Sequence, residues 1–412
     1  MANFAQFTHT KGMELLKQSK QLQKELVVWR RYLHEHAETG FALDKTCAFV
    51  EKKLKSFGYA PKKCGRAGVV ATVGKEKTGK TFLLRADMDA LPIAEETGLP
   101  YACKNGNMHA CGHDMHTAAL LGAAKLLKSR EDELHGQVKL LFQPAEELLE
   151  GASDVIEAGV LDSPKMQAAL ALHVMTATEL PTGTAVVASA GVGAPAADFF
   201  SIEVQGKGCH GSAPWNGVDA LLVAAHIVIA LQALSAREIS VSDPFVLTMG
   251  ALNAGKTGNV IPDKAVLKGT LRAFDEGVRT KVKKRMEEIA KGVAKTFRAS
   301  VKIVYAGGCP TLINDEKLSI FMEKVTKELL GEENVFTSAE LSKDAKTASG
   351  GSEDFAYISQ KIPSQMVALA AGERGQVCVH PLHHPKVRFD EGALFVGAAI
   401  YAKAALAWLG NE

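Results

Sequence analysis

The feature that most constrains the fold is an alternation of apolar runs with amphipathic stretches, which is broken once by a different pattern. Before Pro195 and after Gly307, β-rich runs such as Val69–Val73 and Val138–Phe142 alternate with stretches of helical spacing such as Thr117–Lys128. Alternation of this kind is typical of an α/β layer built on a mostly parallel sheet. We therefore expect an α/β domain on both sides of the break.

Between these two positions the order of elements changes. Phe200, Ile202 and Val204 alternate as a strand, and the segments that follow are predicted in turn as helix, strand, strand, helix and strand: Val218–Leu234, Phe245–Leu252, Ala265–Phe274, Glu276–Phe297 and Val301–Tyr305. The order β-α-β-β-α-β is that of a ferredoxin-like sandwich. A chain of 412 residues has room for two domains. We predict an α/β domain at 1–194 and 307–412, interrupted by an inserted domain at 195–306, with the functional site in the cleft between them.

Composition and charge exclude several classes of partner. Lys and Arg number 48 against 46 for Asp and Glu, without a long run of one sign, which argues against nucleic-acid binding. The most apolar run, Ala220–Leu231, contains His226 and is shorter than the ~20 residues of a membrane span, so we expect a buried helix and no membrane partner. Met1–Gly12 lacks a targeting pattern, and seven irregularly spaced cysteines do not form a disulfide framework. A cytoplasmic location is therefore expected.

The densest chemical signal is the segment MHACGHDMHTA, residues 108–118, which holds three imidazoles and a thiol. Imidazole and thiolate are ligands that Zn²⁺ and similar divalent metals prefer. Cys111 and His113 stand just before a predicted helix, where α/β proteins build their sites. Taken singly, His109 and His116 are more typical of structural histidines, whereas Cys111 and His113 together indicate a metal site.

Further candidate ligands follow later strands. In FQPAEE, Glu146 and Glu147 come directly after an apolar strand, and adjacent acids repel each other unless a cation or proton separates them. One can bind metal while the other acts as a general base, although a solvated helix start also favours acids. His173 ends another apolar strand, and His383 and His384 lie near the C-terminus. Separate metal-compatible residues at several strand ends strengthen the interpretation of a metal site.

These motifs, taken together, resemble those of the dinuclear-metal aminoacylase family, which includes hippurate hydrolases and plant indoleacetyl-amino acid amidohydrolases. The resemblance runs from WRRYLHEHAETGF through MHACGHDMHTA, FQPAEE, ALHV, GKGCHGSAP, TGNVIPDKAVLKGTLR and GGSEDFAY to PLHHPKVRFDE, which is nearly the whole chain. It implies a zinc-exopeptidase-like catalytic domain interrupted by a ferredoxin-like lid domain.

The resemblance also implies roles for individual residues. Two divalent metal ions, Zn, Mn, Ni or Co, would be held by five ligands, with the Cys111 thiolate between the ions: Cys111, His113, Glu147, His173 and His383. Glu146 would be the catalytic acid and base, and His210 would hydrogen-bond the scissile carbonyl oxygen. Asn259 and Arg272 would contact the polar end of the substrate. A guanidinium can bind a carboxylate with two hydrogen bonds, and an imidazole can donate to an oxyanion, so these roles are chemically reasonable.

Some positions depart from the patterns of relatives. Dipeptidase and carboxypeptidase relatives have His where Asp87 stands and Asp where Cys111 stands, which places the chain on the amidohydrolase branch. Cys209 replaces a usual Gly. His384 stands where a small residue is common, so His383 and His384 both remain candidates for the metal ligand.

We therefore expect a metal-dependent amidohydrolase that cleaves N-acyl amino acids, with small-molecule substrates and a lid that closes during turnover. A metallopeptidase acting on di- or short peptides with the same site is the alternative. An amidase with Cys111 as nucleophile and His113 as base, and a metal- or ligand-binding protein without catalysis, are less favoured. The intact Glu146 argues against a pure binder. The apolar helix at Ala220–Leu231 could pack against a second copy of the inserted domain, which would form a homodimer through the lid domain, or it could be covered by its own sheet.

Overall fold

The computed structural model describes residues 2–75, 79–341, 351–372 and 379–410. The chain divides into two compact units. The first comprises Met1–Gly193, Ile313–Thr347 and Tyr357–Glu412, and the second comprises Ala194–Leu312 and Ala348–Ala356. The insertion predicted at 195–306 thus falls within the longer segment of the second unit.

The first unit is built on an eight-stranded sheet in the order β1-β2-β4-β3-β5-β16-β6-β15. The central strands β4, β3, β5 and β16 run parallel to one another, whereas β2 and β6 are antiparallel to their central neighbours. The predicted α/β fold with a mostly parallel sheet is therefore confirmed. The strands span Lys62–Cys64 (β1), Gly68–Gly74 (β2), Lys80–Asp87 (β3), Gly136–Gln143 (β4), Ala169–Met175 (β5), Ala185–Val187 (β6), Val335–Thr337 (β15) and Ser364–Ala370 (β16).

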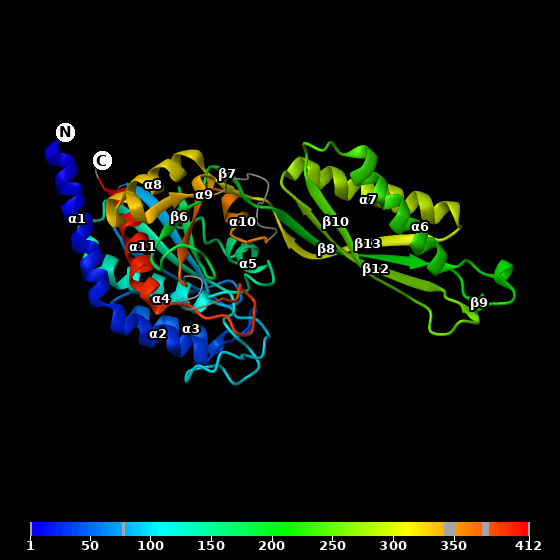
Figure 1. Ribbon diagram of the computed structural model, residues 1–412, viewed down its shortest axis with the longest axis horizontal. Coiled ribbons are helices and arrows are strands. Elements are labelled where there is room, and N and C mark those ends of the chain that lie inside the picture. Colours follow the sequence, from blue (N-terminus) through cyan, green and yellow to red (C-terminus); the bar gives the residue numbers. More distant parts are fainter. Residues whose placement is uncertain (1, 76–78, 342–350, 373–378, 411–412) are drawn as a thin grey trace. The chain divides into compact units, whose positions relative to one another are not determined.

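Helices cover this sheet, and two of them form the centre of the core. Helix α4 (His113–Ser129) and helix α11 (Leu394–Leu409) pack against each other and against β3 (Figure 1). Both helices are mostly apolar around their circumference, which is the pattern of a buried helix. The other helices of this unit are α1 (Ala2–Gln21), α2 (Gln23–Glu35), α3 (Asp44–Ser56), α5 (Gly151–Glu157), α8 (Glu316–Leu330), α9 (Ser338–Leu341) and α10 (Ala356–Ser359).

The second unit has the predicted order of elements. Its antiparallel sheet runs β10-β12-β8-β13, and helices α6 and α7 both lie on one face of it (Figure 1). This is the strand order of a ferredoxin-like sandwich. The bounds are β8 Ala196–Gln205, α6 Ala220–Ala233, β10 Phe245–Ala254, β12 Lys264–Ala273, α7 Glu276–Thr296 and β13 Ser300–Cys309. Two short pairs complete the strands: β9 (Cys209–His210) with β11 (Val260–Ile261), and β7 (Gly191–Ala194) with β14 (Leu312–Asn314).

Helix α6 differs from the buried helix that its apolar run predicts. One face, with Val223, Ile227 and Leu231, is buried against the sheet, but Leu222 is 47% exposed and Ile229 is 69% exposed. The prediction was wrong for this outer face because the sheet covers only one side of the helix. Two helical stretches, Ala220–Glu238 and Glu391–Leu409, have the length and hydropathy of a membrane span, and the second is mostly buried inside the protein.

Candidate active site

The predicted ligands of the first unit gather at the carboxyl ends of the central strands. The loop after β3 carries Cys111 and leads into His113 at the start of α4, Glu146 and Glu147 follow β4, and His173 lies in β5. In open α/β sheets the carboxyl ends of parallel strands are the usual place for a functional site. The topology therefore brings together residues that are far apart in the sequence.

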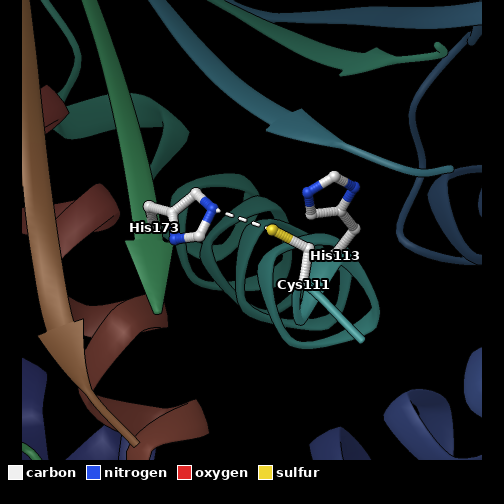
Figure 2. Close-up of side chains that lie close together, drawn as sticks. All are labelled: Cys111, His113 and His173. Atoms are coloured by element: carbon white, nitrogen blue, oxygen red, sulfur yellow. Dashed lines mark hydrogen bonds between the residues drawn. The ribbon is translucent and has the colours of Figure 1, made fainter. Parts of the chain in front are cut away.

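The Cys111 thiol lies between two imidazoles. Figure 2 shows its sulfur between the rings of His113 and His173, with His173 Nε2 at 3.4 Å from Sγ. Cys111 and His113 are buried, and His173 is nearly so. Such a group of two nitrogens and one sulfur is a suitable ligand set for Zn²⁺ or a similar cation.

Both histidines are oriented by hydrogen bonds from their other ring nitrogen. His113 Nδ1 donates to the Asp89 carbonyl oxygen at 2.8 Å, and His173 Nδ1 donates to the Val174 carbonyl oxygen at 2.7 Å. A proton on Nδ1 leaves the Nε2 lone pair free for a metal, which is the usual outer support of a metal-binding histidine. The two rings are therefore held in the tautomer that a ligand needs.

The two glutamates are held by a tight turn after β4. Ala145, which precedes them, has a positive φ of 52°. The backbone N–H groups of Glu146 and Glu147 donate to the two carboxylate oxygens of Asp89, at 3.0 and 3.2 Å. A non-glycine residue at positive φ is strained and needs such support. Asp89 thus orients His113 through its backbone and both glutamates through its side chain.

His383 reaches the same site from the C-terminal part of the chain. Its backbone N–H donates to the Ala110 carbonyl oxygen at 2.9 Å, and its Nε2 lies 3.5 Å from Oε1 of Glu147. His384 instead stacks on His380 with ring centroids 4.1 Å apart. Of the two candidates left open by the sequence, His383 is the one that lies beside Glu147, another predicted ligand.

Two sets of possible ligands share the Cys111 sulfur. Cys111, His113 and His173 form one set and Cys111, Glu147 and His383 form the other, with the ligand atoms of each set within 4.8 Å of one another. His113 Nε2 and Glu147 Oε1 are buried without a hydrogen-bond partner among the described residues. Buried polar atoms are normally paired, so both atoms fit a site for cations. A sulfur common to two sets is the arrangement that a thiolate bridging two ions requires.

The electrostatics of the site also fit a cation. Burial raises the pKa of Glu147 to about 7, and burial raises the pKa of the Cys111 thiol. Burial lowers the pKa of His173 to about 3, which keeps its imidazole neutral. Desolvation opposes the charged form of each group, and a bound cation offsets that cost for the carboxylate and the thiolate. The burial and charge of these side chains therefore suit the binding of a cation.

Gly112 allows the loop to approach the sheet closely. It has a φ of 87°, and a Cβ at this position would lie 2.4 Å from Cγ2 of Val174 in β5. A residue with a side chain would be strained by the backbone and by this contact. Glycine is thus required between Cys111 and His113 in this conformation.

Two further buried polar residues, Asp87 and His116, lie next to His113, and Asp87 Oδ2 is 3.7 Å from His113 Nε2. Asp87 accepts hydrogen bonds from His116 Nδ1 at 2.6 Å and from the Arg85 guanidinium at 2.7 Å. His116 Nε2 in turn accepts the backbone N–H of Val174, so both ring nitrogens are satisfied. Asp87 and Asp89 were not predicted as functional, and the sequence DMD after a buried strand is the signal that could have suggested them.

His109 lies in a different environment from that of His116. Its imidazole is buried, neither ring nitrogen has a hydrogen-bond partner among the described residues, and burial lowers its pKa to about 3. The expectation of a hydrogen-bonded structural histidine therefore holds for His116 and is wrong for His109.

The other predicted residues lie in the second unit. His210 is in β9, opposite Val260 of β11, and its Nδ1 accepts from the Ser212 backbone at 3.2 Å. Asn259 accepts the N–H of Gly211 on its carbonyl oxygen at 2.8 Å, which ties it to the residue next to His210. Arg272 lies in β12 and donates to the hydroxyl of Ser352 at 2.5 Å. Ser352 was not predicted as part of the site.

Comparison with known proteins identifies relatives along nearly the whole chain. Residues 83–407 match the model of peptidase family M20/M25/M40. The chain is 40% identical to an N-acetyl-L-cysteine deacetylase of Bacillus subtilis over 90% of its own length and 85% of the relative's. It is 36% identical to the hippurate hydrolase of Campylobacter jejuni, over 96% of this chain and all of the relative.

A solved structure of the same family shares the fold. A dinuclear metal-binding peptidase from Bacillus subtilis, 33% identical, superimposes with a TM-score of 0.76 over 95% of this chain and 99% of that chain. The resemblance that the motifs indicated is therefore confirmed, as is the class of fold that it implied. The chain belongs to peptidase family M20/M25/M40.

Proposed function

We propose that this protein is a metal-dependent amidohydrolase that cleaves the amide bond of N-acyl amino acids. The observation that carries the proposal is the convergence of Cys111, His113, Glu147, His173 and His383 into two ligand sets that share one sulfur, with Glu146 beside them. The deacetylase and hippurate hydrolase relatives act on small N-acyl compounds by their names, which supports this substrate class.

We propose two divalent cations as cofactors. His113 and His173 would hold one, Glu147 and His383 the other, and the Cys111 thiolate would contact both. We propose Zn, Mn, Ni or Co, because nitrogen and sulfur ligands favour Zn, Ni or Co over Mg or Ca, and the carboxylate of Glu147 also suits Mn. When bound, the cations supply Lewis acidity for a water molecule and for the scissile carbonyl.

Glu146 is the proposed acid and base. Its carboxylate Oε2 lies 3.9 Å from His113 Nε2, and the side chain is 8% exposed. It takes a proton from the attacking water and passes it to the leaving nitrogen, as a carboxylate beside the ligands can. In the second unit, His210 is proposed to donate a hydrogen bond to the carbonyl oxygen, and Asn259 and Arg272 to hold the carboxylate of the amino acid.

A metallopeptidase acting on short peptides would use the same groups, and it differs only in the acyl half of the substrate. The amidase with Cys111 as nucleophile is disfavoured, because burial raises the pKa of this thiol and a neutral thiol is a poor nucleophile. We keep hydrolysis by activated water as the proposed chemistry.

The test of the proposed function is a comparison of Glu146→Gln with the wild type after reconstitution with Zn²⁺ or Mn²⁺. The glutamine keeps the shape of the side chain but cannot accept a proton, so kcat on N-acyl amino acids should fall by about 10³-fold or more while metal content is retained. Glu150→Gln, a nearby surface carboxylate paired with Arg66, is the control and should keep normal rates. Near-normal turnover by Glu146→Gln would remove this residue from the role.

We also propose that the second unit, which the sequence predicts as an inserted domain at 195–306, acts as a lid that closes during turnover. We further propose that this unit joins two chains into a homodimer. The support for the dimer is the exposed apolar face of α6 and the position of β10 at the edge of its sheet. An edge strand presents unpaired backbone groups that a second copy can satisfy. A cytoplasmic location is proposed because the six cysteines described are free thiols.

A further inference from the structure

The sheet of the second unit has one face that its helices leave uncovered. Phe200 and Ile202 of β8, and Leu271 of β12, point into the core under α6 and α7. Because side chains alternate along a strand, Phe199 and Arg272 point to the opposite, open face. Val246 of β10 stands opposite Arg272 in the register and shares that face.

Arg272 is held in place by a hydroxyl group, and no carboxylate in the part of the chain that the structure describes pairs with it. Its guanidinium donates to Ser352 Oγ, and the Ser352 hydroxyl donates to the Pro195 carbonyl oxygen at 2.8 Å. A hydroxyl has one proton, so its donation to Pro195 leaves a lone pair for Arg272. Among the described residues no acid forms an ion pair with Arg272. The guanidinium is therefore fixed in position while its charge remains available for an anion.

Two apolar side chains flank this cation. The ring centroid of Phe199 is 6.0 Å from Cζ of Arg272, and Phe199 is 43% exposed. Val246, across the strand pair, is 54% exposed. Large apolar side chains exposed next to a fixed cation form a surface that suits a ligand with a carboxylate and an apolar group on the same carbon.

We propose that Phe199 and Val246 form the subsite for the side chain of the amino acid, next to Arg272, and select N-acyl derivatives of large apolar amino acids. The inference rests on the proposed function and adds the class of the amine product. Ser352 is a positioning residue that orients Arg272. The carboxylate common to all substrates binds Arg272, whereas only a large apolar side chain gains from burial against Phe199 and Val246.

The test compares kcat/KM for N-acetyl-leucine, N-acetyl-phenylalanine and N-acetyl-glycine. Phe199→Ala should lower kcat/KM for the leucine and phenylalanine substrates by roughly tenfold and leave that for the glycine substrate nearly unchanged. Glu203 lies on the same strand and on the same face of the sheet, four residues from Phe199. Glu203→Ala is therefore the matched control and should leave kcat/KM for all three substrates unchanged. An equal loss on all three substrates would overturn the subsite.

The role of Ser352 is tested by separating KM from kcat. Ser352→Ala should raise KM for all three N-acetyl amino acids with little change in kcat, and Ser352→Thr, which restores the hydroxyl, should recover the wild-type KM. KM for N-acetyl-leucinamide, which has no carboxylate, should not respond. A fall in kcat without a change in KM would contradict a positioning role.

These outcomes are distinguishable from a failure of the proposed function. If the wild type hydrolyses all three substrates but Phe199→Ala shows no preference among them, the subsite is wrong and the amidohydrolase stands. If the metal-reconstituted wild type hydrolyses none of them, the proposed function fails and the subsite fails with it.

Discussion

Glu147 is a largely buried carboxyl group whose Oε1 has no hydrogen-bond partner among the described residues, and burial raises its pKa to about 7. A raised pKa means that the neutral carboxyl favours the folded protein below the ordinary pKa of glutamate. That contribution is lost as pH rises through about 7, because burial disfavours the ionised carboxylate by more than the nearby His113 stabilises it. A bound cation would reverse this dependence of stability on pH, since it stabilises the ionised carboxylate.

Metal binding should therefore release fewer protons as pH rises. Between pH 6 and pH 8 in the metal-free protein, Glu147 changes from mostly protonated to mostly ionised, so the number of protons released per chain should fall by most of one proton. Calorimetric titration with Zn²⁺ in buffers of different ionisation enthalpy measures this number. Glu147→Gln should remove the fall, and Glu150→Gln should retain it. A fall that persists unchanged in Glu147→Gln would show that another group releases the proton.

The sequence predicted the ligands and Glu146 but not the residues that orient them. Imidazole, thiol and paired acids carry a recognisable chemistry, so Cys111 with His113 and the two adjacent glutamates could be singled out, and the family resemblance then implied the role of each residue. Asp89 and Ser352 act through contacts with residues 24 or more positions away, and such contacts exist only after the chain has folded. Their side chains are common types, and although the DMD segment after a buried strand could have marked Asp89 as a candidate, the local sequence does not show what either residue contacts.

At the level of elements, a buried network of charges joins α2 to the start of α4. Arg30 of α2 forms an ion pair with Asp114 at 2.8 Å, and His34 contacts Asp114 at 2.8 Å and Glu95 at 3.1 Å. All four side chains are at most 1% exposed. Asp114 directly follows His113, so this network holds the start of α4, the helix that follows the loop carrying Cys111.

Arg30→Met should therefore destabilise the metal-free protein by about 3 kcal/mol or more, because Asp114 loses a partner in a buried position. Arg31→Met is the matched control. Arg31 is 47% exposed where it pairs with Glu391, and loss of an exposed pair costs about 0–1 kcal/mol. Urea unfolding followed by circular dichroism measures both. An equal loss of unfolding free energy in the two variants would show that the buried network stabilises the protein no more than the exposed pair does.

The loop between β3 and α4 depends on Gly112. Gly112→Ala should destabilise the fold by about 1–3 kcal/mol and weaken metal retention, because the new methyl group would meet Val174 and the backbone would be strained. Gly106→Ala has a similar φ of 90° but nothing within 4 Å of a Cβ, so it shows the backbone cost alone. Thermal unfolding and metal content compare them. Normal metal retention in Gly112→Ala would contradict a requirement for close approach.

At the scale of the whole molecule, the order of elements could be predicted and parts of the sheet could not. The alternation of apolar runs with stretches of helical spacing predicted the parallel strands at the centre of the first sheet. The order β-α-β-β-α-β predicted the ferredoxin-like sandwich of the inserted domain. Strands β6 and β15 have three residues each, which is too short for a periodic signal, so they were missed. The outer face of α6 was predicted as buried because its sequence is apolar all round, although the sheet covers only one side.

The exposed face of α6 gives a prediction about assembly. Ile229→Asp places a charge on that face and should convert the proposed dimer to a monomer, because burial of an unpaired charge in an interface is costly. Ile320→Asp in α8 of the first unit is the control, since Ile320 is 64% exposed and Ile229 is 69% exposed. Light scattering after gel filtration gives the mass. A monomeric wild type, or a dimer that survives Ile229→Asp, would contradict the interface.

The most direct test of the account is the number of metal ions bound per chain. Metal-free protein titrated with Zn²⁺ or Mn²⁺, with bound metal measured by mass spectrometry, should saturate at two ions per chain, and hydrolysis of N-acyl amino acids should rise with occupancy. Cys111→Ala should lose the paired stoichiometry and the activity together, because both ligand sets share this sulfur. A wild type that hydrolyses these substrates with no bound metal, or a Cys111→Ala variant that keeps two ions and full activity, would contradict the account.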